Sequence, residues 1–192
     1  MTPTITLETE RLILRPWNLS ETDRSAFHFL MSDESVRQFY PTRKTRDEAD
    51  KLLEGLVETY NSADLAWGAA CLKTTGEPIG FTGLAEVNFD APFTPAVEIG
   101  WIYKPAFWKQ GLASEAARAL FKHGFDDLGL NEIVAFTARI NTPSSAVMRS
   151  LGMERNAEND FDHPMVTDDA AHLRPHIVYR LNRQQWHKQK GR

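Results

Sequence analysis

Hydrophobic spacing in the first third of the chain predicts one strand followed by helices. Residues 11–15 alternate polar and apolar side chains, as a half-buried strand does, and the proline that follows ends the pattern. Apolar residues at helical spacing follow Ser20 and Thr45, which are both good N-cap residues. Glu48 stands three residues after Thr45 and completes a capping box, and a short second pattern over 35–39 lies between the two helices.

The middle of the chain reads as a meander of three strands followed by a long helix. Apolar runs over 65–72 and 79–89 are joined by a turn rich in Thr, Gly and Pro, which indicates a hairpin. A third strand is predicted over 97–103. Hydrophobic residues over 112–128 then recur at helical spacing, and Gly129 ends this helix.

The last third of the chain is predicted to contain a strand over 132–138, a short helix over 141–152 and a final strand over 176–181. The segment 156–164 is polar and acidic, and residues 184–192 form a polar, basic tail. This order of elements indicates an α/β or α+β fold with one mixed sheet.

The composition fits a single domain over residues 1–192. Hydrophobic residues make up 42% and charged residues 25%, which is usual for a globular chain of this length. The net charge of −4 argues against a protein that binds the nucleic-acid backbone. The longest apolar run, 65–72, is too short to cross a bilayer, and no secretory hydrophobic segment is evident, so we expect a soluble, cytoplasmic protein.

Disulfide and metal chemistry are not expected. Cys71 is the only cysteine, and its apolar neighbours favour a buried structural residue over a nucleophile. His172 and His176 have the spacing of a metal-binding pair on a helix. Pro175 between them argues against a helix, and no third ligand is evident.

The stretch from Tyr103 to Leu120 carries the candidate chemistry. It leads from a strand through a loop into a helix, with Gly111 at the tightest point and Lys109 as the positive charge of the loop. No Asp or Glu lies in the loop, and free amides at a helix N-terminus suit an anion. The glycine patterns of the P-loop and of the dinucleotide fingerprint are both absent. These residues predict a site for a phosphorylated cofactor.

Three motifs, in this order and spanning nearly the whole chain, resemble the GNAT N-acetyltransferases. Residues 108–113, Trp-Lys-Gln-Gly-Leu-Ala, are similar to motif A, whose pattern is Arg/Gln-x-x-Gly-x-Gly/Ala. Residues 141–153 resemble motif B, with Asn141, Ser144 and a closing Leu-Gly-Met. Residues 9–15 resemble the opening strand of the RimJ/RimL-like branch. The resemblance implies a mixed, mostly antiparallel sheet of about six or seven strands flanked by about four helices, with a splay between the fourth and fifth strands.

The resemblance also implies a site for acetyl-CoA. Backbone amides of the loop would bind the pyrophosphate, and backbone groups at the end of the preceding strand would bind the pantetheine arm. Lys109 stands where the branch usually has Gly, and it either pairs with a CoA phosphate or is solvated. The implied cofactor-binding residues are Trp101, Ile102, Tyr103, Lys109, Gln110, Gly111, Leu112, Ala113, Ser114, Asn141 and Ser144.

Glu98 and Ser144 are the implied catalytic residues. Glu98 lies on the splayed strand, where many members keep a Glu that takes a proton from the amine, although a strand Glu is commonly a solvated or paired group. Ser144 falls on the motif B Ser, which is proposed to protonate the thiolate, and it can also cap its helix. Many members use a Tyr acid in this helix, and Met148 stands in its place. Glu86 and Asp90 are weaker rivals of Glu98.

Candidates for the acceptor side come from two regions. Phe39 and Tyr40 are expected beside the first helices, where they would line an acceptor pocket, whereas Trp17 fits the core better. The segment 160–164 either contacts a cationic substrate through its carboxylates or is a solvated loop.

The sequence therefore predicts an acetyl-CoA-dependent N-acetyltransferase that works by direct attack of a primary amine in a ternary complex. No Ser or Cys nucleophile with a nearby His is visible, so no acyl-enzyme is expected. The acceptor is a protein N-terminal α-amine or a small-molecule amine, including an antibiotic or polyamine amine. A non-catalytic acyl-CoA-binding sensor is the alternative. We expect no nucleic acid, membrane or metal partner, and a monomer or homodimer.

Overall fold

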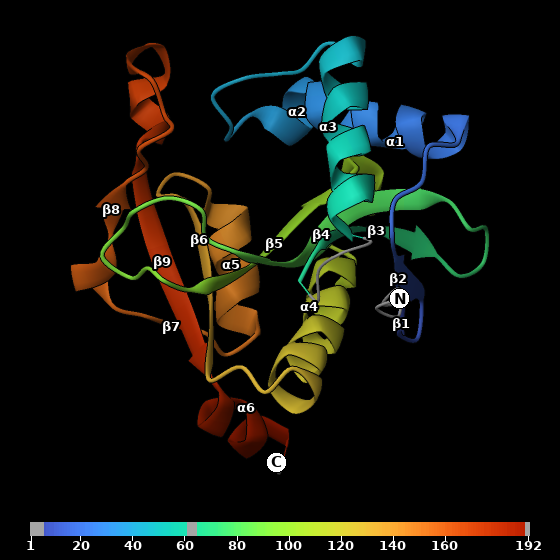
Figure 1. Cartoon of the computed structure of the whole chain (residues 1–192). Coiled ribbons are helices and arrows are strands. Elements are labelled where there is room, and N and C mark those ends of the chain that lie inside the picture. The colour runs from blue at the N-terminus through green and yellow to red at the C-terminus, as the bar shows by residue number, and fades with distance from the viewer. Residues whose placement is uncertain (1–5, 61–64, 191–192) are drawn as a thin grey trace.

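A sheet of nine strands forms the centre of the computed structural model, which describes residues 6–60 and 65–190 (Figure 1). The strand order is β1-β2-β3-β4-β5-β6-β9-β7, and β8 also pairs with β9. The strands are β1 (Leu7–Glu8), β2 (Leu12–Arg15), β3 (Trp67–Leu72), β4 (Pro78–Glu86), β5 (Val97–Tyr103), β6 (Glu132–Ala138), β7 (Glu154–Arg155), β8 (Phe161–Asp162) and β9 (Pro175–Asn182).

Six α-helices within the described residues cover both faces of the sheet (Figure 1). A cluster around Phe27 and Leu53 packs the first three helices on one face, and a larger cluster around Phe121 packs the later helices on the other. The helices are α1 (Glu21–Ser32), α2 (Glu34–Arg37), α3 (Arg46–Tyr60), α4 (Leu112–Lys122), α5 (Thr142–Ser150) and α6 (Arg183–Lys190). Short 3₁₀ turns span Pro105–Phe107, Ala157–Asn159 and Asp168–Leu173.

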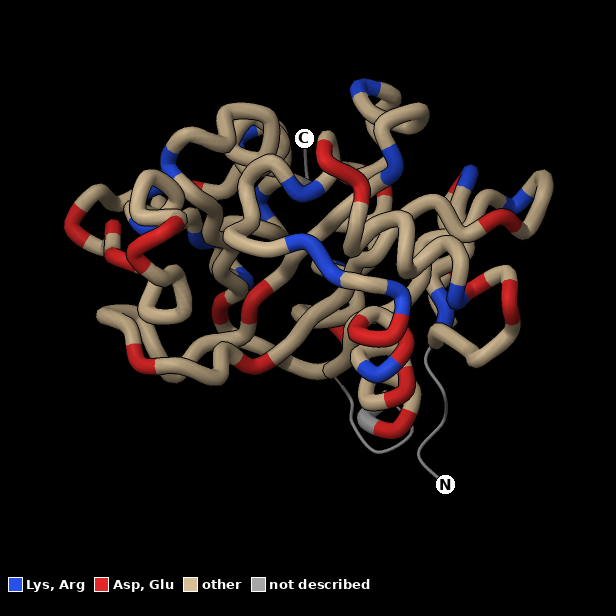
Figure 2. Tube along the Cα trace, turned by 90° about the horizontal axis from the view of Figure 1, so that it is seen from above, with Lys and Arg blue, Asp and Glu red and all other residues tan. Residues whose placement is uncertain are grey.

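The surface carries both signs of charge. In the view of Figure 2, Lys and Arg are interspersed with Asp and Glu instead of gathering on one basic face. Among the helices that the structure describes, none has the length and apolar character needed to cross a membrane.

The first and third helices begin at the N-cap residues that the sequence predicts, Ser20 and Thr45. Ser20 Oγ accepts a hydrogen bond from the Asp23 amide at 3.3 Å, and Glu48 Oε2 accepts one from the Thr45 amide at 2.8 Å. The capping box is confirmed, because the Glu48 amide donates in turn to Thr45 Oγ1. The Asp23 carboxylate is buried and accepts two hydrogen bonds from Arg15, which fastens α1 to β2.

Strands β5 and β6 separate soon after they meet, which confirms the implied splay. They form a parallel pair that shares one residue pair, Glu98 and Val134. Strand β5 continues to pair with β4 over 97–103, and β6 pairs with β9 over 132–138. Beyond Glu98, one edge of β5 therefore has no strand neighbour among the described residues.

Several element boundaries differ from the prediction. The two-residue strands β1, β7 and β8 raise the strand number above the expected six or seven. Strand β4 ends at Glu86, and the acidic segment 156–164 contains β8 and a 3₁₀ turn. The helix expected over 112–128 is α-helical to Lys122 and then continues as a π-helical turn over His123–Asp127. Hydrophobic spacing alone does not separate these two helical forms.

The segment expected as a polar tail, 184–192, is helix α6 as far as the structure describes it. Trp186 is only 4% exposed, and its ring centroid lies 5.7 Å from that of Phe121 and 6.1 Å from that of Phe125. The segment is polar in composition, but burial of one indole is enough to dock a short helix on the core.

The β3–β4 hairpin depends on a glycine at a close approach of two backbones. A Cβ atom at Gly83 would lie 2.1 Å from the Ala66 carbonyl oxygen and 2.8 Å from Trp67 Cα. We expect Gly83→Ala to lower the free energy of unfolding by about 2–3 kcal/mol, measured by urea denaturation. Gly55→Ala is the matched control, because a Cβ there meets nothing within 4 Å. This change in α3 should raise stability by up to about 1 kcal/mol, and equal effects of the two substitutions would contradict the close approach.

Candidate active site

A cavity of about 710 Å³ lies at the end of β5, between the N-terminal ends of α4 and α5. The segment around α2 borders it through Ser35, Gln38, Phe39 and Tyr40. The predicted cofactor-binding residues that line it are Trp101, Ile102, Tyr103, Lys109, Gly111, Leu112, Ala113, Ser114, Asn141 and Ser144. The fold thus brings together residues that the sequence places in three separate elements.

The loop before α4 has the backbone conformation of an anion site. Lys109 and Gly111 both have positive φ, 59° and 76°, and Gly111 caps α4 without a side-chain hydrogen bond. Left-handed residues of this kind turn neighbouring amides toward one concave side, and the first amides of a helix have no intrahelical acceptor. A phosphate group fits such a cradle, since the helix dipole also favours negative charge there.

Gln110 lies in this loop, but its side chain is not part of the cavity wall. The side-chain amide donates to the Ala106 carbonyl at 2.8 Å, and the Gln110 carbonyl accepts a hydrogen bond from Arg11 at 3.0 Å. Gln110 is thus the one predicted cofactor-binding residue that is not among those lining the cavity.

The register of β4 and β5 decides which backbone groups face the gap beside β6. The Lys104 amide donates to the Ile79 carbonyl at 2.9 Å, so Ile102, two residues earlier, also directs its backbone groups toward β4. Trp101 and Tyr103 alternate with Ile102 and face the open edge. In this register, the backbone groups available to pair with an extended pantetheine arm are those of Trp101 and Tyr103. Ile102 reaches the cavity with its side chain.

Tyr103 has a second contact that limits its role. The indole Nε1 of Trp108 donates to the Tyr103 carbonyl at 2.6 Å. The Tyr103 hydroxyl is buried without a hydrogen-bond partner among the described residues, and burial raises the pKa of this phenol far above its ordinary value. The ring packs against Gly80, where a Cβ would lie 2.6 Å from it. This phenol therefore stays protonated and belongs to the core.

The sequence left two roles open for Ser144, proton donor and helix cap, and in the structure the cap of α5 is Asn141. Asn141 Oδ1 accepts a hydrogen bond from the Ser144 amide at 3.2 Å, so Asn141 is the cap. Asn141 Nδ2 donates to Thr137 Oγ1 at 2.9 Å, which fixes the amide orientation. The partly buried Ser144 borders the cavity. Met148 is 2% exposed in the core, so the place of a Tyr acid holds an apolar side chain.

Glu98 is partly buried on β5, at the point where β6 leaves. It shares a face of the strand with Ile102, whose side chain packs toward the first helices. Burial raises the pKa of Glu98 to about 7. Glu98 is not among the residues that line the cavity, but Tyr40 is.

The acidic segment has its own partners. Asp160 forms ion pairs with Arg139 and Arg155, and it is 11% exposed. The rivals of Glu98 are both exposed: Glu86 is the last residue of β4 and pairs with Val97, and Asp90 lies on the loop that follows. The Asp160 carboxylate is already paired with two arginines of the protein itself. This segment therefore offers less negative charge to a substrate than its composition suggests.

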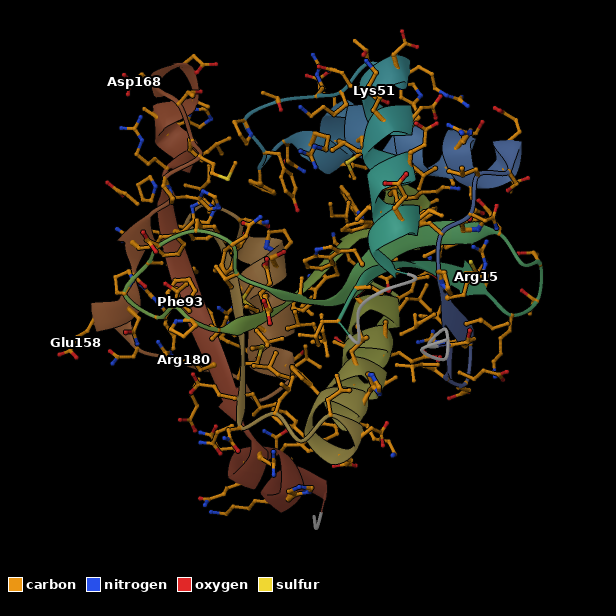
Figure 3. The ribbon with its side chains drawn as sticks, in the orientation of Figure 1. Arg15, Lys51, Phe93, Glu158, Asp168 and Arg180 are labelled. Atoms are coloured by element: carbon orange, nitrogen blue, oxygen red, sulfur yellow. The ribbon has the colours of Figure 1, made fainter. Side chains whose placement is uncertain are left out.

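Two histidines lie in an aromatic cluster away from the cavity. The rings of His163 and His176 are 4.7 Å apart, and Phe136 and Phe161 pack around them. Phe93, on the loop between β4 and β5, joins this cluster (Figure 3). Burial lowers the pKa of both histidines, that of His163 to about 4. In the part of the chain that is described, no three His, Cys, Asp or Glu side chains are grouped to hold a metal ion.

Sequence reasoning missed part of the cavity wall. Thr142, Pro143, Val147 and Ser150 line it along α5, and Phe107 lines it from the 3₁₀ turn. The helical spacing of the α5 residues was a usable signal, because positions three and four apart share a face. Ser35, Val36 and Gln38 could not be placed this way, since their contact with the cavity depends on how α1–α3 pack on the sheet. Phe39 and Tyr40, which the sequence places at a pocket beside the first helices, do line the cavity. Trp17 is 2% exposed in the core, as expected.

The fold and this cavity place the chain in a known enzyme class, and comparison with other proteins agrees. Residues 11–154 match the family model described as "Acetyltransferase (GNAT) domain". The chain belongs to the GNAT family of N-acetyltransferases, whose members use acetyl-CoA as co-substrate.

Relatives and solved structures support this membership. The chain is 43% identical over 152 residues to "Uncharacterized N-acetyltransferase YnaD" of Bacillus subtilis, covering 78% of this chain and 82% of that protein. It is 31% identical over 189 residues to "FsC-acetyl coenzyme A-N(2)-transacetylase" of Aspergillus fumigatus, covering 94% and 77%. A GNAT-family acetyltransferase from Bacillus anthracis superposes with a TM-score of 0.77 at 25% identity, covering 94% and 99% of the two chains.

The left-handed conformation of Lys109 yields a stability prediction. A non-glycine residue with φ of 59° costs about 1 kcal/mol, and glycine removes that cost. Lys109→Gly should therefore be more stable than Lys109→Ala by about 1 kcal/mol in urea denaturation, although both lack the charge. A more stable alanine variant would contradict the assigned backbone conformation.

The raised pKa of Glu98 yields a second prediction. The folded protein holds this proton more tightly than the unfolded chain, so stability is lost as pH rises from 4.5 to about 7. Glu98→Gln, which cannot ionise, should be more stable than the native protein above pH 7 by up to about 3 kcal/mol, and the advantage should vanish at acidic pH. Glu86→Gln, at an exposed site, is the control. A gain that is the same at every pH would refute burial of the Glu98 charge.

Proposed function

We propose that this N-acetyltransferase moves the acetyl group of acetyl-CoA to a primary amine by direct attack in a ternary complex. The observation that carries the proposal is the single cavity that runs from the loop at Gly111, past the open edge of β5, to Ser144 and Tyr40. Such a cavity allows the cofactor and the acceptor to meet within one site, as direct transfer requires.

The phosphate end of the cofactor is assigned to the loop before α4. Backbone amides from Gln110 to Ser114 would hold the pyrophosphate, and Lys109 adds one positive charge beside them. The open edge of β5 at Trp101 would pair with the amides of the pantetheine arm, as an added strand does. Asn141 acts through the start of α5, which it caps, and so holds Ser144 in place.

The reaction exchanges a C–S bond for a C–N bond and needs two proton transfers. The amine nitrogen attacks the thioester carbonyl carbon, the new C–N bond forms, and the C–S bond breaks. Glu98, with its pKa near 7, accepts through water the proton that the amine loses. The Ser144 hydroxyl donates a proton to the leaving thiolate. Cys71 is 2% exposed and burial raises its pKa, so this thiol is unsuited to form an acyl-enzyme.

The acceptor class rests on two different signals. The motif at residues 9–15 resembles the RimJ/RimL-like branch, which includes enzymes that acetylate protein N-terminal α-amines and others with small amine substrates. The printed name of the Aspergillus relative specifies transfer to an N(2) nitrogen and mentions no protein N-terminus, so a small-molecule amine stays the second candidate. Both acceptors are amines that would approach the cavity from the side of α2, Phe39 and Tyr40.

Thiol release from acetyl-CoA is the direct test, with peptides of varied N-terminus, polyamines and aminoglycosides as acceptors. We expect release that depends on one amine class and yields the acetylated product by mass. Tight CoA binding without release for any amine would reject transfer and favour an acyl-CoA-binding sensor.

The role of Glu98 gives a kinetic prediction. Glu98→Gln should lower kcat by about 10²-fold near neutral pH and leave the KM for acetyl-CoA within about twofold, because the base acts in the chemical step. Native kcat should rise through pH 7, and the deficit of the variant should narrow at high pH, where the amine loses its proton unaided. Glu86→Gln should behave as the native enzyme. An unchanged kcat in Glu98→Gln would remove Glu98 from the mechanism.

A further inference from the structure

The carboxylate of Glu115, in the first turn of α4, is surrounded by donors from the turn between β1 and β2. Its Oε1 accepts hydrogen bonds from Thr9 Oγ1 at 2.5 Å and from the Arg11 amide at 2.7 Å. Its Oε2 accepts from Arg11 Nε at 2.7 Å and lies 2.6 Å from Arg11 Nη2. These contacts join residues more than a hundred positions apart in the chain, and Glu115 is only 16% exposed.

The guanidinium of Arg11 also contacts the loop before α4. While Nε and Nη2 engage Glu115, Nη1 donates to the Gln110 carbonyl at 3.0 Å. An arginine can hold both partners because its donors form a rigid, planar fork. Arg11 is not part of the cavity wall, and its Nη2 would lie 3.6 Å from a Cβ at Gly111, so it sits behind the loop.

The contact with Gln110 also sets the direction of the next amide. The carbonyl of Gln110 and the N–H of Gly111 belong to one planar trans peptide unit, in which the two groups point in opposite directions. Because Arg11 holds the carbonyl, the Gly111 N–H is directed away from Arg11. Gly111 borders the cavity and Arg11 does not, so this amide is aimed at the side where an anion would bind.

We propose that Arg11 and Glu115 are positioning residues for the cofactor phosphates, and that they act by fixing the Gln110–Gly111 peptide rather than by touching the ligand. This inference rests on the proposed function for the identity of the ligand. Glu115 orients the guanidinium, Arg11 holds the carbonyl, and the amide is ready before the cofactor arrives. The conformational entropy of fixing that amide is then lost during folding and not on binding, which improves the affinity for the cofactor.

A role in stability alone would have a different signature. A variant that merely loosens the fold weakens use of every substrate alike, whereas a misaimed phosphate amide harms only ligands that carry the pyrophosphate. Acetyl-CoA and S-acetyl-pantetheine separate the two cases, because they share the thioester and the pantetheine arm and only the former has phosphates.

The test measures both substrates with Arg11→Lys and Glu115→Gln, with Glu21→Gln as control. Lysine keeps the charge but cannot engage Glu115 and Gln110 together. We expect the KM for acetyl-CoA and the Kd for CoA to rise about tenfold in both variants, with kcat within about twofold. The kcat/KM for S-acetyl-pantetheine should stay at the native value. Glu21, on α1 and 76% exposed in its pair with Arg46, should show no change with either substrate.

The outcomes that overturn the inference are specific. Equal losses with both substrates, or an unchanged KM for acetyl-CoA, would show that the contacts serve stability only. If Glu115→Gln fails to fold, Arg11→Lys decides. If the native protein binds CoA but transfers to no amine, transfer fails as the function, and the tenfold rise in Kd for CoA still tests the inference. Loss of kcat with unaltered CoA affinity would reject the inference and leave the proposed function standing.

Discussion

The parting of β5 and β6 is the constraint on which the rest of the site depends. Two neighbouring parallel strands ordinarily satisfy each other's backbone groups along their length. Here the pair shares only Glu98 and Val134, and the edge of β5 beyond it is left for something else to pair with. Because β4 and β9 hold the two strands on their outer sides, the gap stays open without disrupting the sheet.

The gap alone would not select a ligand, and the elements around it supply the chemistry. Helix α4 begins where β5 ends, so its N-terminal amides and the left-handed residues Lys109 and Gly111 lie at one end of the cavity. Helix α5 begins after β6, and Asn141 caps it so that Ser144 faces the same space. The loop before α4 and the start of α5 thus follow the two strands that diverge, and both border the cavity.

The face of β5 turned toward α1–α3 carries Glu98, the base of the proposed mechanism. Glu98 alternates with Ile99 and Tyr103 along the strand, so it lies on the side of α1–α3 while those residues join the core under α4. The first helices reduce its contact with water and raise its pKa to about 7, a value suited to a base near neutral pH. A residue that looks like an ordinary strand carboxylate acquires this property from packing rather than from its neighbours in sequence.

The sequence by itself determined most elements and the turn before α4, because helix caps, strand alternation and the glycine before α4 are local properties of the chain. It also marked Asn141 and Ser144 through their motif. It could not determine that Arg11 reaches Glu115 and Gln110, that Trp186 docks the last helix, or that Ile102 turns its backbone toward β4. Those outcomes depend on register and on contacts between distant segments, which only the tertiary structure decides.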